Sequence, residues 1–212
     1  MTRLPFATPA EVAQSATEII AHLRNGGLIA YPTETVYGFG SLVRDDALTS
    51  LAALKARDAA KPFLLLIRDA ADLPELIWTP SARILAARFW PGPLTLALRV
   101  QEGFPSRILS SEGTVAVRAT GHDGVRALLE LLGEPITSSS VNLPRQPPAA
   151  NADEAAAVLD DLGRTDVVIL DGGQLASSLP STLIDCSGEP PRLLRAGAIT
   201  LDAITQLVEV DE

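Results

Sequence analysis

The sequence predicts a single α/β domain with a mixed sheet. Helical and strand patterns alternate along most of the chain, which is typical of parallel strands joined by crossover helices. Two pairs of predicted strands, at 94–100 with 114–118 and at 182–185 with 192–194, follow each other directly, so antiparallel pairs are expected as well. The chain has 212 residues and is 47% apolar, which is enough to bury one core of ordinary size.

Six helices are predicted from apolar residues at helical spacing and from their capping residues. The first has the clearest signal, because Thr8 supplies an N-cap hydroxyl, Pro9 occupies the first helical position and Glu11 lies three residues after the cap. Gly26 ends it. The other helices are expected at 45–55, where Asp45 or Asp46 can act as the cap, and at 80–89, 124–132, 152–162 and 200–207.

Eight strands are predicted from short apolar runs that end at proline, glycine or a charged residue. The run at 63–67 is wholly apolar and lies between Pro62 and Arg68, which is typical of a buried strand. The others are expected at 28–31, 94–100, 114–118, 136–139, 167–170, 182–185 and 192–194. Residues 1–8 are expected to form an N-terminal tail of a domain that spans 1–212.

Composition excludes several classes of protein and site. Lys plus Arg is 17 and Asp plus Glu is 26, so the net charge is −9, which argues against general binding to a nucleic-acid backbone. The single cysteine, Cys186, excludes an internal disulfide and a multi-cysteine zinc site. The first residues lack the apolar run of a signal peptide, and the aliphatic run at 63–67 is too short to span a membrane, so we expect a cytoplasmic protein.

The common nucleotide-binding signatures are missing, yet polar residues gather where apolar strands end. After the strand at 28–31 come Thr33, Glu34, Thr35 and Tyr37, which fit either a ligand site or a turn begun by proline. The strand at 136–139 leads into hydroxyls and an amide, at 137–142, which fit either an anion-binding nest or a plain turn.

Cations stand at two further strand and helix ends. Lys55, Arg57 and Lys61 suit a triphosphate, although charge at a helix C-terminus is the commoner explanation. Arg118 ends a strand and suits a carboxylate or phosphate, although a surface ion pair is the alternative. Together the four segments predict an anion-binding cleft without a metal cage and without a nucleophile–base pair.

These segments resemble the motifs of the YrdC/Sua5 family, the threonylcarbamoyl-adenylate synthases of tRNA modification. The opening motif corresponds to residues 31–40, YPTETVYGFG. The remaining motifs occur in the family's order, at 55–57, 89–95, 114–118, 138–143, and 180–182 with 194–195. The resemblance runs from about residue 10 to residue 205.

The resemblance implies a YrdC-like domain with a twisted mixed sheet, flanking helices and a central ligand cleft. It also implies the short form of the family, because the chain ends before the C-terminal domain of the long form. The implied enzyme is a nucleotidyltransferase that makes threonylcarbamoyl-AMP and pyrophosphate from L-threonine, bicarbonate and ATP, for the t6A modification of tRNA. Such chemistry depends on positioning anions and neutralising phosphate charge, which the four polar segments suit.

The resemblance also implies residue roles. Threonine would be bound by Thr33, Tyr37, Arg118 and Ser181. The nucleotide would be bound by Lys55, Arg57, Thr114, Ser138, Ser140, Asn142 and Arg195, with Lys55 and Arg57 also catalytic. Mg²⁺ would arrive with ATP, with no tightly bound cofactor. Contact with tRNA or a downstream threonylcarbamoyl-transferase is expected, and contact with a membrane is not.

One departure from the family leaves alternatives open. Leu66 stands where the family often has a histidine that contacts threonine. The chain is therefore also compatible with an adenylating enzyme that uses a different acceptor, or with an RNA-binding or regulatory paralogue on the same fold.

Overall fold

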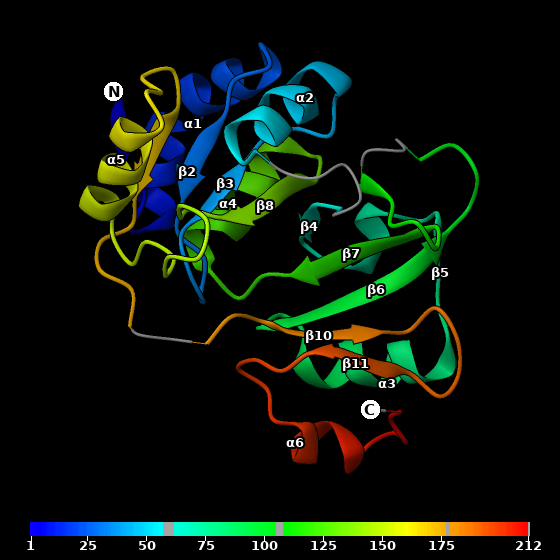
Figure 1. Ribbon diagram of the computed structural model, residues 1–212. Helices are drawn as coiled ribbons and strands as arrows, with labels where there is room; N and C mark the ends of the chain where they lie inside the picture. The colour runs from blue at the N-terminus through cyan, green and yellow to red at the C-terminus, as the bar shows by residue number, and fades with distance from the viewer. Residues whose placement is uncertain (57–61, 105–107, 177–178, 212) are drawn as a thin grey trace.

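Eleven strands form one mixed sheet in the computed structural model, which describes residues 1–56, 62–104, 108–176 and 179–211 (Figure 1). Their order is β1-β9-β2-β3-β8-β4-β7-β6-β10-β11, with β5 paired to β6. The strands are β1 (Arg3–Pro5), β2 (Ile29–Tyr31), β3 (Gly38–Gly40), β4 (Leu64–Ile67), β5 (Leu76–Ile77), β6 (Leu94–Val100), β7 (Thr114–Ala119), β8 (Ile136–Ser140), β9 (Val168–Asp171), β10 (Thr182–Asp185) and β11 (Arg192–Arg195).

The predicted helices are all present, so the predicted α/β class with a mixed sheet is confirmed. They are α1 (Pro9–Arg24), α2 (Asp45–Leu54), α3 (Pro80–Phe89), α4 (Asp123–Leu132), α5 (Ala152–Asp161) and α6 (Leu201–Thr205), with a short 3₁₀ turn at Ala70–Asp72. Thr8 and Glu11 form the predicted capping box. The predicted cap of α2 is wrong, because Arg44 is the N-cap and its side chain makes no capping hydrogen bond.

Two predictions about the N-terminal third are corrected. Residues 3–5 are not part of a tail, because β1 pairs in parallel with β9 and Arg3 forms an ion pair with Asp171 at 2.9 Å. The segment at 38–40, for which no strand was predicted, forms β3 between β2 and β8. Glycine is required at Gly40, since a Cβ there would lie 2.7 Å from the carbonyl oxygen of Thr137.

The sheet has two parts that meet at the β8–β4 pair. We call the strands β1-β9-β2-β3-β8 the upper half-sheet and β4-β7-β6-β10-β11 the lower half-sheet, following their places in Figure 1. Helices α1, α2, α4 and α5 gather around the upper half-sheet, whereas α3 and α6 lie beside the lower one. One space between the two half-sheets is surrounded by the ends of β7, β8 and β10, together with the loop between β2 and β3.

Candidate functional site: an anion-binding cavity between the half-sheets

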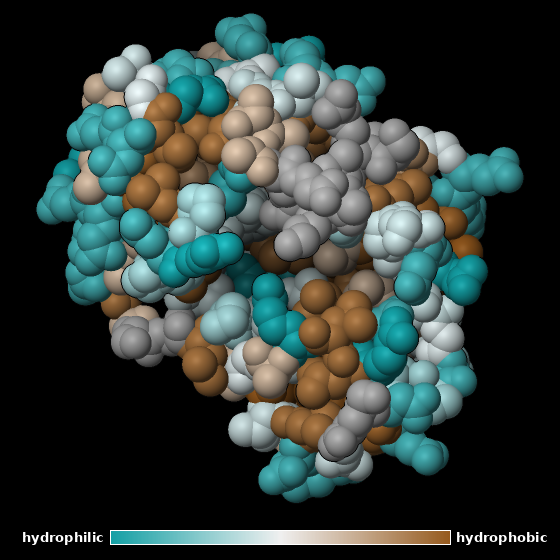
Figure 2. Space-filling view, in the orientation of Figure 1, coloured by the Kyte–Doolittle hydropathy of each residue, from teal (hydrophilic) through white to brown (hydrophobic). Residues whose placement is uncertain are grey.

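A cavity of about 520 Å³ lies between the two half-sheets. Its polar walls come from distant segments of the chain, namely Thr33, Thr35, Thr95, Arg118, Ser138, Ser139, Ser140, Ser181 and Arg195. Apolar side chains, among them Leu64 and Leu183, complete the wall. Figure 2 shows the surface hollowed between the upper and lower parts of the molecule. This cavity is the candidate for the ligand cleft expected from the sequence.

Six of the predicted site residues line the cavity: Thr33, Arg118, Ser138, Ser140, Ser181 and Arg195. Lys55 and Asn142 lie directly behind the wall, at the end of β8, whereas Tyr37 and Thr114 lie elsewhere. Two predicted cations, Arg57 and Lys61, lie outside the described residues.

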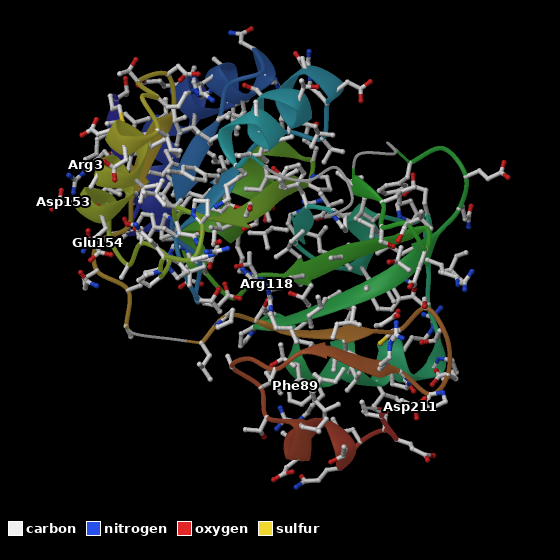
Figure 3. The ribbon with its side chains drawn as sticks, in the orientation of Figure 1. Arg3, Phe89, Arg118, Asp153, Glu154 and Asp211 are labelled. Atoms are coloured by element: carbon white, nitrogen blue, oxygen red, sulfur yellow. The ribbon has the colours of Figure 1, made fainter. Side chains whose placement is uncertain are left out.

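Arg118 lies at the centre of the molecule, between the half-sheets (Figure 3). It is only 2% exposed, and β7 holds its backbone between β4 and β6. Its Nη1 donates to Oγ1 of Thr35 at 3.2 Å, and its Nε lies 3.7 Å from Oε1 of Glu34. Within the described ranges its Nη2 has no hydrogen-bond partner, so one edge of the guanidinium is available to a ligand.

Arg195 approaches the same space from β11. Its Nε and Nη2 donate to the carbonyl oxygen of Ser181 at 3.1 and 2.9 Å, and Nη2 also donates to the Ser181 hydroxyl at 3.0 Å. That hydroxyl is hydrogen-bonded to the hydroxyl of Thr95 at 2.8 Å. These contacts fix the guanidinium beside the cavity.

Two guanidinium groups beside one cavity create a strong preference for an anion. Burial, and then the positive charge of Arg118, lower the pKa of Arg195. No carboxylate of the described chain forms an ion pair with Arg195, and Arg118 has only the long contact to Glu34. A bound carboxylate or phosphate would therefore supply the charge that these side chains lack.

The hydroxyl of Thr33 is engaged within its own turn. It donates to the carbonyl oxygen of Val36 at 2.8 Å and accepts from the backbone N–H groups of Thr35 and Val36, both at 3.2 Å. Thr33 therefore shapes the wall of the cavity, and its hydroxyl is not free to donate to a ligand unless the turn opens.

Lys55 is directed at the end of β8. At the C-terminus of α2, its Nζ donates to the carbonyl oxygens of Ser140 and Asn142 at 2.9 Å each and to Oδ1 of Asn142 at 3.0 Å. The Asn142 amide also accepts from the Ser140 hydroxyl at 2.6 Å and donates to Leu143 and Gln146. Lys55 and Asn142 thus form a clamp that holds the hydroxyl-rich end of β8 against the cavity.

Tyr37 and Thr114 are hydrogen-bonded away from the cavity. The Tyr37 phenol donates to the carbonyl oxygen of Gly173 at 3.0 Å and accepts from the N–H of Gly172 at 3.1 Å, so it fastens the turn after β9. Thr114 begins β7, where its hydroxyl is hydrogen-bonded to that of Ser110 at 2.7 Å. Thr114 belongs to the same motif as Arg118, and Tyr37 belongs to the same motif as Thr33, but neither side chain lines the cavity.

Leu66 does not reach the cavity wall. It is fully buried in the core beneath α1 and α4, together with Phe6 and Tyr31. Leu64, two residues earlier on β4, lines the cavity instead. Leu66 therefore makes no direct contact with the cavity through which it could change the amino-acid pocket.

Three further polar wall residues, Thr35, Thr95 and Ser139, were not among the residues predicted to bind substrate. Each lies inside one of the family motifs, and the hydroxyl-rich composition of those motifs was the available signal. In the described part of the chain, no three His, Cys, Asp or Glu side chains are grouped to hold a metal ion. No described helix is long and apolar enough to cross a membrane.

Comparisons with known proteins agree with this fold. The Sua5/YciO/YrdC family profile, described as telomere recombination, matches residues 21–197. A threonylcarbamoyl-AMP synthase from Pyrococcus abyssi is 37% identical over 194 residues, which cover 88% of this chain and 55% of the relative. One from Chromohalobacter salexigens is 39% identical over 187 residues, covering 86% of this chain and 98% of the relative. The chain spans about half the length of the P. abyssi relative.

A solved structure of a relative has the same fold. The crystal structure of P. abyssi Sua5 complexed with L-threonine superposes with a TM-score of 0.85 at 32% identity, covering 99% of this chain and 62% of that one. The family profile matches most of the chain, and the C. salexigens relative is matched over nearly its whole length. The chain therefore belongs to the Sua5/YciO/YrdC family.

Proposed function

We propose that this protein is an L-threonylcarbamoyladenylate synthase, which makes threonylcarbamoyl-AMP for the t6A modification of tRNA. The observation that carries the proposal is the pair of guanidinium groups of Arg118 and Arg195, which line one cavity together with Ser181. The relatives with this activity in their names, and the relative that binds L-threonine, support the choice of substrates. We take residues 1–212 as one domain for this activity, because one sheet runs through both half-sheets.

The two substrates would occupy different ends of the cavity. The free edge of Arg118, in the cavity that Ser181 also lines, suits the carboxylate of threonine, and Thr33 and Thr35 shape that end. The Ser138 and Ser140 hydroxyls and Arg195 suit the nucleotide and its phosphates, which Mg²⁺ would accompany as part of the substrate. We assign Lys55 and Asn142 to positioning the end of β8, and Arg57 remains proposed as a phosphate ligand.

The reaction would proceed in two steps within this arrangement. The threonine amine attacks the carbon of bicarbonate and water leaves, which gives a carbamate. A carbamate oxygen then attacks the α-phosphorus of ATP, and pyrophosphate leaves with the bonding electron pair. The protein contributes by holding the carbamate and the α-phosphate in contact and by placing cations near the developing charge. No side chain needs to form a covalent intermediate.

The direct test is threonine-dependent release of pyrophosphate. The protein is incubated with MgATP, L-threonine and bicarbonate, and both pyrophosphate and an AMP-containing product are measured. Release that requires all three substrates is the expected result, and release without threonine dependence would contradict the proposal. Replacing threonine by serine, valine or homoserine in the same assay tests for a different acceptor.

A further inference from the structure

Glu34 lies behind the cavity wall and takes no part in the reaction proposed for this cavity. It belongs to the loop between β2 and β3, where its neighbours Thr33 and Thr35 line the cavity and Glu34 does not. Its Oε2 accepts a hydrogen bond from the hydroxyl of Thr120 at 2.7 Å, just beyond the end of β7. Thr120 is fully buried, so this tether fixes the carboxylate in place.

The second carboxylate oxygen faces Arg118. Oε1 of Glu34 lies 3.7 Å from Nε of Arg118, which is within ion-pair range but too long for a hydrogen bond. Across the described residues, these two are the buried side-chain atoms without a hydrogen-bond partner. The side chains are 19% and 3% exposed, so their attraction is weakly screened.

The placement of Glu34 decides which edge of Arg118 meets a ligand. The carboxylate attracts the Nε side of the guanidinium, Thr35 binds Nη1, and only the Nη2 edge is left toward the cavity. Arg195 repels the same guanidinium from across the cavity. A fixed negative charge on the far side balances this repulsion and keeps Arg118 from turning away.

We propose that Glu34 is a positioning residue that orients Arg118 for its anion, and that Thr120 in turn fixes Glu34. The identity of the anion as the amino-acid carboxylate rests on the proposed function. Glu34 acts through Arg118 and does not touch the substrate.

Kinetics of matched variants test the link to the anion. Glu34→Gln keeps the shape and removes the charge, Thr120→Val keeps the charge and removes the tether, and Glu18→Gln removes an exposed charge on α1 as a control. We expect Glu34→Gln to raise the KM for threonine about 10-fold, Thr120→Val about 3-fold and Glu18→Gln not at all, with the KM for ATP changed less than about 2-fold. In an Arg118→Lys background, Glu34→Gln should add less than about 2-fold. Equal rises in both KM values, or additive effects in the double variant, would show a merely structural role and overturn the proposal.

A spectroscopic measurement tests the positioning without reference to turnover. The ¹⁵Nε–¹Hε signal of Arg118, assigned by its loss in Arg118→Lys, reports the buried Nε–H directly. We expect slow hydrogen exchange in the wild type and in Glu18→Gln, and exchange faster by about 10-fold or more in Glu34→Gln. Unchanged exchange in Glu34→Gln would overturn the positioning role. If the wild type released no pyrophosphate, the proposed function would fail while this signal still decided the role of Glu34.

Discussion

Lys55 and Arg118 are two cations at one cavity, and the fold uses them in opposite ways. Lys55 directs its ammonium group at three oxygens of Ser140 and Asn142, all within 3.0 Å. Arg118 is more deeply buried, yet it makes one hydrogen bond, at 3.2 Å, and one long ion pair. The hydrogen bonds of Lys55 are all made to the protein itself, whereas Arg118 keeps N–H donors that a ligand can use.

The difference indicates how a structural cation can be told from a ligand-binding one. A donor beside a cavity that has no protein acceptor can hydrogen-bond to a ligand there. A donor that already has its partners stabilises the backbone that carries them. By this criterion Arg118 should govern affinity, whereas Lys55 should govern both stability and the shape of the wall.

The largest expected effect is that of Arg118→Lys. Lysine keeps the charge but loses the flat fork of donors, so the KM for threonine should rise roughly 100-fold while the KM for ATP changes little. Steady-state pyrophosphate release at varied threonine and varied ATP measures both. Arg24→Lys, at an exposed position on α1, is the control and should leave both constants unchanged. A larger effect on ATP would mean that the two ends of the cavity are exchanged.

Lys55→Met should instead lower stability. Its three hydrogen bonds to β8 and Asn142 would be lost, and we expect the free energy of unfolding to fall by about 3 kcal/mol. Urea denaturation measures this change. Arg24→Met removes another cation near a helix C-terminus, one that is exposed, and should change stability by less than about 0.5 kcal/mol. An unchanged unfolding midpoint for Lys55→Met would refute the clamp.

Gly197→Ala tests the close packing of the backbone around Ser181, whose carbonyl oxygen binds Arg195. A Cβ at Gly197 would lie 2.2 Å from the carbonyl oxygen of Pro180 and 2.5 Å from the carbonyl carbon of Ser181, so the backbone that carries Ser181 must move. We expect a loss of about 2 kcal/mol in unfolding free energy together with weaker substrate binding. Gly188→Ala is the matched control, because nothing lies within 4 Å of its Cβ. Similar stability of the two variants would contradict the close approach.

The smallest expected effect is a change of stability with pH at His122, whose backbone N–H donates to the Thr120 hydroxyl that holds Glu34. Its Nδ1 accepts from the N–H of Val125 and caps α4. Burial lowers the pKa of His122 below its ordinary value of 6.5, although the charges of Glu34 and Asp123 oppose the shift.

The unfolded chain therefore takes up the proton first as pH falls, and stability that is complete above pH 6.5 declines below it. His122→Asn keeps a capping side chain and removes the titration. Urea unfolding at about pH 7.5 and about pH 5.5 should show a larger loss for the wild type, by roughly 0.5–1 kcal/mol, the size of an N-cap contribution. An equal loss in both proteins would assign the pH dependence to other groups.

Sequence patterns predicted the helices well and the short strands poorly, for a physical reason. Capping residues and apolar spacing act locally, so α1 could be placed from Thr8, Pro9 and Glu11. The three residues of β1 and the glycine-rich β3 carry little strand preference of their own, and pairing with distant strands decides them.

The sequence by itself determined the fold class, the order of the polar motifs and six residues of the cavity wall. Only the tertiary structure decided what those residues do there, because hydrogen-bond partners come from segments far apart in the chain. Tyr37 shares its motif with Thr33, and Lys55 belongs to another motif of the family, yet the donors of both are directed at protein oxygens. Arg118 keeps an unused edge because β7 buries it beside a tethered Glu34 that hydrogen bonds to Thr120 instead. A motif specifies which chemical groups are present, and packing specifies which of them are left unsatisfied.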